Sequence, residues 1–393
     1  MRTDHDLIHL LDDEPPTPST VDVRGAIVTG RRRRTIRRAG FAGAAVTALA
    51  VTAVVAVGGN LFTPRPAEVA DPAFPLPTCT VETLPGVSDP RVTGLGVTGS
   101  DSTGRYHVGR TEPVAEAVLW ADGKATIVDL PGEGKAALTD VNASGTAVGW
   151  RFAKDGDAEP VPFVVERGTV TPLPGVEHGI PHAINDSGVI AGESDGYAVR
   201  WASPHDAAAR LMLSSGTYRS RALAVDRDGV IVGETVSAVE WSAVVWPSLN
   251  EVRALQASRI DGRLPSVRMV SDIRNGWIVG TASTTLRTPT KDIAPEVQKT
   301  VTMRWDVAGN PVEIIDQSKV TPATVTSDGW IIGNDATGTP VLYNSDVTTP
   351  LPLPADSQAA TDSRYTASDD GRVITGLVVH PSGARRPVLW RCN

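Results

Sequence analysis

The chain has 393 residues, and its 37 glycines and 30 prolines are spread along its length. That distribution favours many short strands joined by turns, and argues against long helices or a disordered polymer. A net charge of −8 argues against a surface built for nucleic acid.

The first 59 residues have the pattern of a membrane anchor. Residues 1–38 are polar and end in an arginine-rich run, and residues 39–59 carry no charge and are almost all Ala, Val, Gly, Leu and Thr. As a helix, residues 39–59 would span about 31 Å, the thickness of a bilayer core. Because the arginines stay on the cytoplasmic side, we expect a single-pass protein in the cell membrane, with everything after Gly59 outside the cell. A cleaved signal peptide is the alternative, since Val54-Val55-Ala56 offers a small-residue cleavage site.

The segments on either side of this helix are expected to lack a packed core. We expect the cytoplasmic tail, residues 1–38, to be mostly disordered; its short apolar stretch, residues 7–11, leaves docking of a cytoplasmic protein open. The layout resembles that of actinobacterial single-pass proteins, some of which regulate sigma factors, although the tail has no cysteine and so lacks the zinc-binding pattern of one anti-sigma class. Residues 60–78 contain five prolines and predict a semi-rigid extracellular stalk.

From Cys79 onward one unit occurs seven times. Its clearest copy, Ile184–Gly192, predicts the end of one strand, a turn made by Asn, Asp, Ser and Gly, and a second strand closed by glycine. A turn glycine and a closing glycine recur together at Gly104/Gly109, Gly145/Gly149, Gly188/Gly192, Gly229/Gly233, Gly276/Gly280, Gly329/Gly333 and Gly371/Gly376. The closing glycines lie 40 to 53 residues apart, which is typical of four-stranded propeller blades.

Each closing glycine is followed by a loop, an apolar third strand that usually ends in an aromatic residue, and a fourth strand that often ends in Leu-Pro. Residues 117–120, 243–246 and 388–390 are third strands of this kind, each ending in Trp. We interpret the recurring Trp as core that packs between blades, in preference to a ligand-binding cage. The sequence therefore predicts an all-β fold, a seven-bladed β-propeller over residues 79–393. An elongated β-solenoid or a pair of sandwiches is the alternative.

These units resemble the extracellular HAF-type repeats, in which A-x-x-I-N-x-x-G-x-V-V-G precedes a short apolar strand ending in Trp. Residues 182–192 and 141–149 match best, and the resemblance covers residues 79–393, although the His-Ala-Phe tripeptide is absent. The resemblance implies an exported, propeller-like β domain. It implies no established activity.

The two ends of the repeat region predict how the ring closes. The last copy stops just after its third strand, while residues 79–86 form a fourth strand with no blade before it. We therefore expect this N-terminal strand to complete the seventh blade, which removes an open sheet edge. Cys79 and Cys392 then come together, and outside the cell a disulfide between them can persist. Two unrelated free thiols are the alternative.

The sequence predicts no catalytic residue, no metal site and no cofactor. It contains no nucleophile elbow, zinc-protease motif, phosphate loop or dinucleotide fingerprint. The histidines of the domain that we expect outside the cell show no metal-ligand spacing. The loops after the second and fourth strands share one face and vary in length, which marks that face for binding. Seven residues on it are our ligand-binding candidates: Glu177, His178, Glu193, Asp195, Tyr218, Arg219 and Trp241.

The favoured function is a membrane-anchored, extracellular and non-enzymatic binding or scaffolding module. Its expected partners are the lipid bilayer, through residues 39–59, and an extracellular protein or glycan; nucleic acid is not expected. One alternative is a signalling protein that couples the propeller to a cytoplasmic partner such as a sigma factor. Another is a propeller hydrolase or lyase, because the fold alone does not exclude an enzyme.

Overall fold

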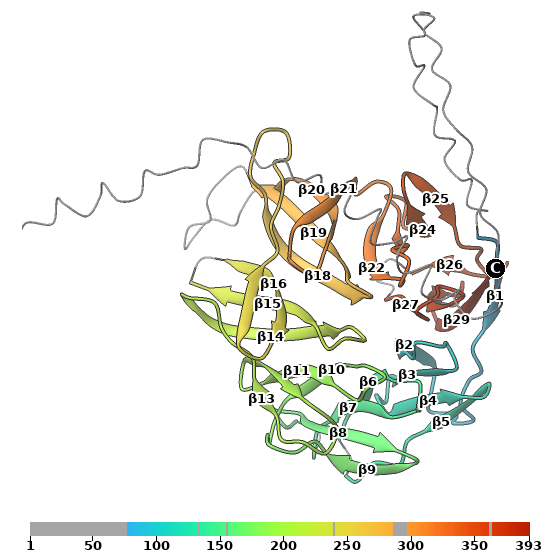
Figure 1. Cartoon of the computed structure of the whole chain (residues 1–393). Helices are drawn as coiled ribbons and strands as arrows, with labels where there is room; N and C mark the ends of the chain where they lie inside the picture. Colours follow the sequence, from blue (N-terminus) through green and yellow to red (C-terminus); the bar gives the residue numbers. More distant parts are fainter. Residues whose placement is uncertain (1–76, 133, 155, 239, 286–296, 361–363) are drawn as a thin grey trace, which may run out of the picture. The chain divides into compact units, whose positions relative to one another are not determined.

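The computed structural model describes residues 77–132, 134–154, 156–238, 240–285, 297–360 and 364–393. Within them, antiparallel sheets form seven blades arranged in a ring (Figure 1). The predicted seven-bladed propeller is confirmed, and the solenoid and the paired sandwiches are excluded. No helix in these residues is long and apolar enough to cross a bilayer. The predicted tail, membrane helix and residues 60–76 of the stalk lie outside the described residues.

Each blade runs from an inner strand to an outer strand in chain order. Blades 1 and 2 contain β2 (Gly94–Ser100), β3 (Tyr106–Glu112), β4 (Ala117–Ala121) and β5 (Lys124–Ile127), then β6 (Ala136–Val141), β7 (Ala147–Arg151), β8 (Val161–Glu166) and β9 (Thr169–Pro172). Blades 3 and 4 contain β10 (Ile180–Ile184), β11 (Ile190–Ser194), β12 (Tyr197–Trp201) and β13 (Ala209–Arg210), then β14 (Thr217–Val225), β15 (Ile231–Ser237), β16 (Trp241–Ser248) and β17 (Glu251–Ala254). Blades 5 and 6 contain β18 (Ser266–Arg274), β19 (Trp277–Thr285), β20 (Val297–Trp305) and β21 (Pro311–Asp316), then β22 (Thr321–Val325), β23 (Ile331–Asn334), β24 (Pro340–Asn344) and β25 (Val347–Pro350).

The seventh blade combines both ends of the described chain. It contains β26 (Gln358–Ala359), β27 (Thr366–Ala367), β28 (Val373–Val379), β29 (Arg385–Cys392) and, as its outer strand, β1 (Cys79–Thr83). β1 pairs antiparallel with β29 (Figure 1), with Cys79 opposite Cys392. A disulfide joins these two cysteines. Closure by the N-terminal strand and the predicted disulfide are both confirmed. The inner strand of this blade is split into two short pieces, which the repeat pattern did not predict.

The recurring tryptophans connect neighbouring blades. Five of them, each at most 1% exposed, donate an indole N–H to a backbone carbonyl just after the outer strand of the preceding blade. These bonds are Trp120 to Pro85 (2.9 Å), Trp201 to Pro174 (2.9 Å), Trp246 to Met212 (2.7 Å), Trp305 to Gln256 (2.5 Å) and Trp390 to Pro352 (2.6 Å). The interpretation as core between blades is confirmed, and the buried indole nitrogen has a partner each time, as a buried polar group requires.

The closing glycine of each repeat has a steric cause. In blades 1 to 6 the inner strand carries a β-bulge opposite this glycine, for example between Pro181 and Ala183. The bulge brings a carbonyl so close that a Cβ on Gly192 would lie 2.4 Å from the oxygen of Ile180. The motif therefore ends in glycine because the backbone of the inner strand occupies the space of a side chain.

Candidate functional site

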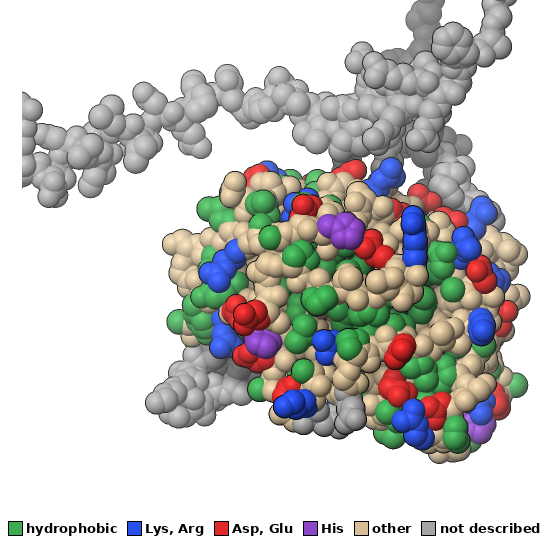
Figure 2. Space-filling model, turned by 90° about the horizontal axis from the view of Figure 1, so that it is seen from below, with side chains coloured by type: hydrophobic (Ala, Val, Ile, Leu, Met, Phe, Trp, Pro, Cys, Tyr) green, Lys and Arg blue, Asp and Glu red, His purple; other side chains and the backbone are tan. Residues whose placement is uncertain are grey.

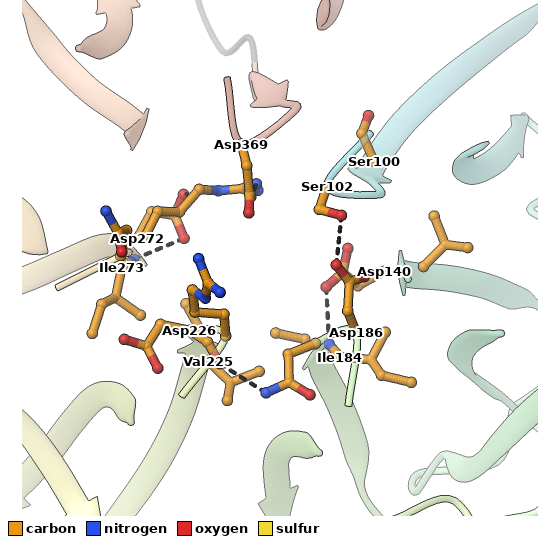
Figure 3. Close-up of a pocket in the computed structure, with 17 residues that line it drawn as sticks. Ser100, Ser102, Asp140, Ile184, Asp186, Val225, Asp226, Asp272, Ile273 and Asp369 are labelled. Atoms are coloured by element: carbon orange, nitrogen blue, oxygen red, sulfur yellow. Dashed lines mark hydrogen bonds and ion pairs between the residues drawn. The ribbon is translucent and has the colours of Figure 1, made fainter. Parts of the chain in front are cut away.

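The two ends of the ring differ in the contacts that their polar side chains make. At one end, which we call the turn end, the inner strands turn into the second strands, as at residues 185–189. There the inner strands and turns of six blades line a cavity of about 80 Å³ (Figure 3). Its charged lining residues are Asp140, Asp186, Arg227, Asp226, Asp272, Arg274 and Asp369.

Asparagines in the turns join successive blades at this end. The Oδ1 of Asn185 accepts hydrogen bonds from the amides of Ser187 (3.1 Å) and Val189 (2.9 Å), which holds the turn. Its Nδ2 donates to the carbonyl of Asp226 in blade 4 (2.8 Å), and Nδ2 of Asn142 donates to the carbonyl of Asn185 in the same way (3.2 Å). These asparagines therefore serve contacts between blades as well as turn geometry.

Two further contacts cross the ring between blades that are not neighbours. Ser102 in blade 1 donates to Asp186 in blade 3 (2.6 Å; Figure 3), and Arg274 in blade 5 donates to Asp369 in blade 7 (2.7 Å). Much of the polar lining at the turn end is thus used to hold the blades together.

Asp140 is the most perturbed acid in this cavity. Burial raises the pKa of its carboxyl group to about 7, although the carboxylate accepts a hydrogen bond from the Ile184 amide (2.9 Å). Among the described residues, no group of three or more His, Cys, Asp and Glu side chains could hold a metal ion. The cavity therefore offers one acid that titrates near neutrality, without a metal site.

A buried Ser–His contact lies where blades 1 and 7 meet. The Ser100 hydroxyl lies 2.8 Å from Nδ1 of His107 and 2.5 Å from the Thr366 hydroxyl, which in turn contacts Thr375 (2.7 Å). Burial lowers the pKa of His107 to about 4, so its imidazole is neutral at pH 7. The network joins blade 7 to blade 1.

The predicted ligand-binding residues lie at the opposite end of blades 3 and 4, which we call the loop end. Glu177 and Asp195 are exposed, as are Tyr218, Arg219 and Trp241. The Arg219 side chain of blade 4 lies beside Gly196, the residue that follows Asp195 in blade 3, so the two blades are in contact at this point. His178 instead contacts Glu159 of blade 2 (3.4 Å).

Glu193 and Trp241 belong to a set of five residues that we call the loop-end cluster: His182, Glu193, Arg221, Glu234 and Trp241. Arg221 donates from Nε (2.9 Å) and Nη2 (2.7 Å) to one oxygen of Glu234, and its guanidinium lies 4.9 Å from the centroid of the Trp241 ring. Nε2 of His182 lies 3.5 Å from Oε1 of Glu193. Arg221 thus contacts Glu234 and Trp241, and its charge acts on the Glu193 carboxyl group.

The carboxyl groups of the loop-end cluster have opposite pKa shifts. His182 lowers the pKa of Glu193, and the charge of Arg221 lowers it further. Burial raises the pKa of Glu234, while Arg221 opposes that shift. Glu234 is only 3% exposed, so its carboxylate is held inside the protein and fixes the position of the guanidinium.

Sequence reasoning missed Arg221, His182 and Glu234 as members of the site. Arg221 lies opposite Glu234 in the pairing of β14 with β15. The Asp226–Gly229 turn could have predicted this pairing, because a tight turn fixes which residues face each other across two strands. His182 occupies the bulge of its inner strand, and a bulge re-aims a side chain in a way that simple alternation does not predict.

The surface at the bottom of the ring, as the ring is drawn in Figure 1, carries charges of both signs. Figure 2 shows acidic and basic side chains intermixed there, with apolar side chains between them. This side of the molecule therefore presents no single charge to a partner.

Comparison with known proteins gives a likeness of fold. No family model matches the chain, and no curated protein sequence matches it significantly. Similar solved structures include YCF48 bound to D1 peptide (12% identity, TM-score 0.46, covering 80% of this chain and 96% of that one) and Kuenenia stuttgartiensis hydrazine synthase (12%, 0.47, 78% and 97%). A third is the β-propeller domain of the Trilobed protease from Pyrococcus furiosus (10%, 0.44, 76% and 95%). The resemblance to HAF-type repeats stays a prediction, and the chain is, by its structure, a seven-bladed β-propeller.

Proposed function

We propose that this chain is a membrane-anchored extracellular binding module that takes its ligand at the loop end of blades 3 and 4. The observation that carries the proposal is the environment of Trp241. Its side chain is 45% exposed, whereas the five interblade tryptophans are buried. A large exposed aromatic beside a fixed arginine is typical of residues that dominate binding energy at interfaces.

The cluster is also rigid, which favours binding. Arg221 cannot swing freely, because two hydrogen bonds tie it to the buried Glu234 and the Trp241 ring packs against it. A ligand would then meet side chains already in position, so less conformational entropy is lost on association.

The contrast between the two ends supports the same assignment. At the turn end, the side chains of Asn185, Ser102 and Arg274 donate hydrogen bonds to residues of other blades. At the loop end, Tyr218 and Trp241 face solvent. The extracellular location rests on the predicted membrane segment 39–59, and a disulfide of the kind found between Cys79 and Cys392 persists in oxidising compartments.

Site-specific photo-crosslinking of the full-length chain in intact cells tests the proposal. A benzophenone amino acid replaces Tyr218 at the loop end or, as a matched control in the same blade, Asp228 in the turn of blade 4. We expect a crosslinked product from position 218, its loss when Trp241→Ala is added, and no product from position 228. A product from position 228 alone, or from neither position, would contradict the assignment of the binding face.

The anchor is tested separately, by adding a protease to intact cells. We expect residues 79–393 to be digested or released while a fragment containing residues 1–59 stays with the membrane. A propeller protected until the cells are lysed would contradict the extracellular location.

A further inference from the structure

We infer that the loop-end cluster binds an uncharged saccharide, an inference that rests on the proposed function and names its ligand class. The first step is the platform. Trp241 exposes nearly half of its surface at the start of β16, and no repeat position requires an aromatic there. The apolar C–H face of a sugar ring packs well on such an indole face, because both surfaces are flat and only weakly hydrated.

The second step is charge. Arg221 is paired with the buried Glu234, while Glu193 lies beside the imidazole of His182. An anionic ligand would have to displace Glu234 from Arg221 and would also meet the Glu193 carboxylate, whose pKa is lowered. An uncharged ligand rich in hydroxyl groups can hydrogen-bond to the same side chains without breaking the pairs.

The third step is hydrogen-bonding capacity. Arg221 uses Nε and Nη2 on Glu234, and its side chain is 41% exposed, so the guanidinium still presents N–H groups to solvent. Nε2 of His182 is buried without a hydrogen-bond partner in the protein, a state that costs free energy. Glu193 is 29% exposed, and its Oε1 lies 3.5 Å from that nitrogen of His182. Donors and acceptors beside an apolar platform match the two kinds of surface that a sugar ring presents.

The experiment is calorimetric titration of the full-length chain with tetrasaccharides. The neutral probes are the tetramers of N-acetylglucosamine, glucose and mannose, which represent different glycan sources, and the charged probe is tetragalacturonate. We expect one neutral tetramer to bind in the micromolar to millimolar range, with weaker or no binding of the charged probe.

Variants then locate the site. Trp241→Ala should weaken binding at least about tenfold, Trp241→Phe should retain most of it, and Glu193→Gln should weaken it less than Trp241→Ala does. The matched control is Met212→Ala, which removes an equally exposed apolar side chain outside the cluster and should leave the affinity unchanged. Thermal unfolding of each variant checks that the ring is intact.

Three outcomes would overturn the inference: no neutral tetramer binds at about 10 mM, tetragalacturonate binds most tightly, or Trp241→Ala leaves the affinity unchanged. If photo-crosslinking at position 218 then yields a protein adduct that depends on Trp241, the ligand is a protein and the proposed function survives without the saccharide. If both experiments fail, the loop-end cluster is not a binding site.

Discussion

Asn185 allows the contacts between blades to be separated from the geometry of the turn. Its side chain makes three hydrogen bonds: two hold the turn through Ser187 and Val189, and one reaches the carbonyl of Asp226. Each contributes about 1 kcal/mol net, and a buried group left without a partner costs a further 1–3 kcal/mol. Asn185→Ala removes all three bonds and should lower the free energy of unfolding by about 3–5 kcal/mol at any pH.

Asn185→Asp should behave differently, because Asp226 shows that a carboxylate can hold the same turn. Its Oδ1 accepts from the amides of Asp228 and Val230 at 2.9 Å. An aspartate at position 185 keeps the two turn bonds but, when ionised, places a charge against the Asp226 carbonyl. Burial raises the pKa of Asp226, and the new carboxyl group should be shifted in the same direction.

The sign of the pH effect follows from that shift. A carboxyl group whose pKa is higher in the folded state makes the protein less stable as the pH rises above the pKa of the group in the unfolded chain, about 3.9. At pH 4 the protonated acid can still donate to Asp226, so the cost should be under about 1 kcal/mol, and at pH 8 it should approach about 3 kcal/mol.

The assay is urea denaturation of the full-length chain followed by tryptophan fluorescence, with wild type and both variants compared at pH 4 and pH 8. Equal losses for the Asp and Ala variants at pH 4 would refute the reasoning, since they would mean that the turn bonds contribute nothing. A pH-independent loss for Asn185→Asp would refute the role of the bond to blade 4.

Three further predictions concern other parts of the ring. Replacing Cys79 and Cys392 by Ser, or reducing their disulfide, should lower the midpoint of urea denaturation. The disulfide closes a loop spanning 313 positions, and its loss costs up to about 5 kcal/mol. An unchanged midpoint in the presence of a reductant would contradict this prediction. Because burial raises the pKa of Asp140 to about 7, the free energy of unfolding should fall as the pH rises from 4 to 7. Asp140→Asn should reduce that fall by up to about 4 kcal/mol in denaturation measured at each pH. If the pH profile of the variant runs parallel to that of the wild type, Asp140 is not the source of the fall. Gly192→Ala should lower the melting temperature far more than Gly216→Ala, because a Cβ on Gly192 would lie 2.4 Å from a carbonyl oxygen. At Gly216 no atom lies within 4 Å of such a Cβ, and only the φ of +78° is unfavourable. Similar melting temperatures of the two variants would contradict the steric account of the closing glycine.

The fold could be predicted from the sequence because local signals repeat. A turn glycine and a closing glycine mark the first two strands of every blade, and a Trp ends the third strand in five of them. The unmatched strand at Cys79 and the missing strand after Cys392 then predict closure, which the pairing of β1 with β29 confirms. These inferences need only turn chemistry and strand counting.

The candidate site could be predicted only in part. Loop variability predicted the end of the ring that carries Glu193 and Trp241. It did not predict Arg221, which packs on Trp241 and whose charge lowers the pKa of Glu193. Which side chains meet depends on strand register and bulges, such as the one beside Ala222, and no pattern of apolar residues encodes these directly. Nor did the sequence show that Asn185 reaches the next blade, because a turn residue already has a sufficient local reason to be Asn.

The disulfide of the seventh blade has a mechanical consequence. Any tension that reaches the ring along the chain preceding residue 79 enters β1 at its first residue, and there the Cys79–Cys392 bond transfers it directly to the last strand. Without that bond, the same pull would peel the five paired residues of β1 from β29 one after another, beginning at the loaded end. The covalent bond thus shields the pairing of β1 with β29 from force, so that pulling on the chain before residue 79 would load β29 and the rest of the blade.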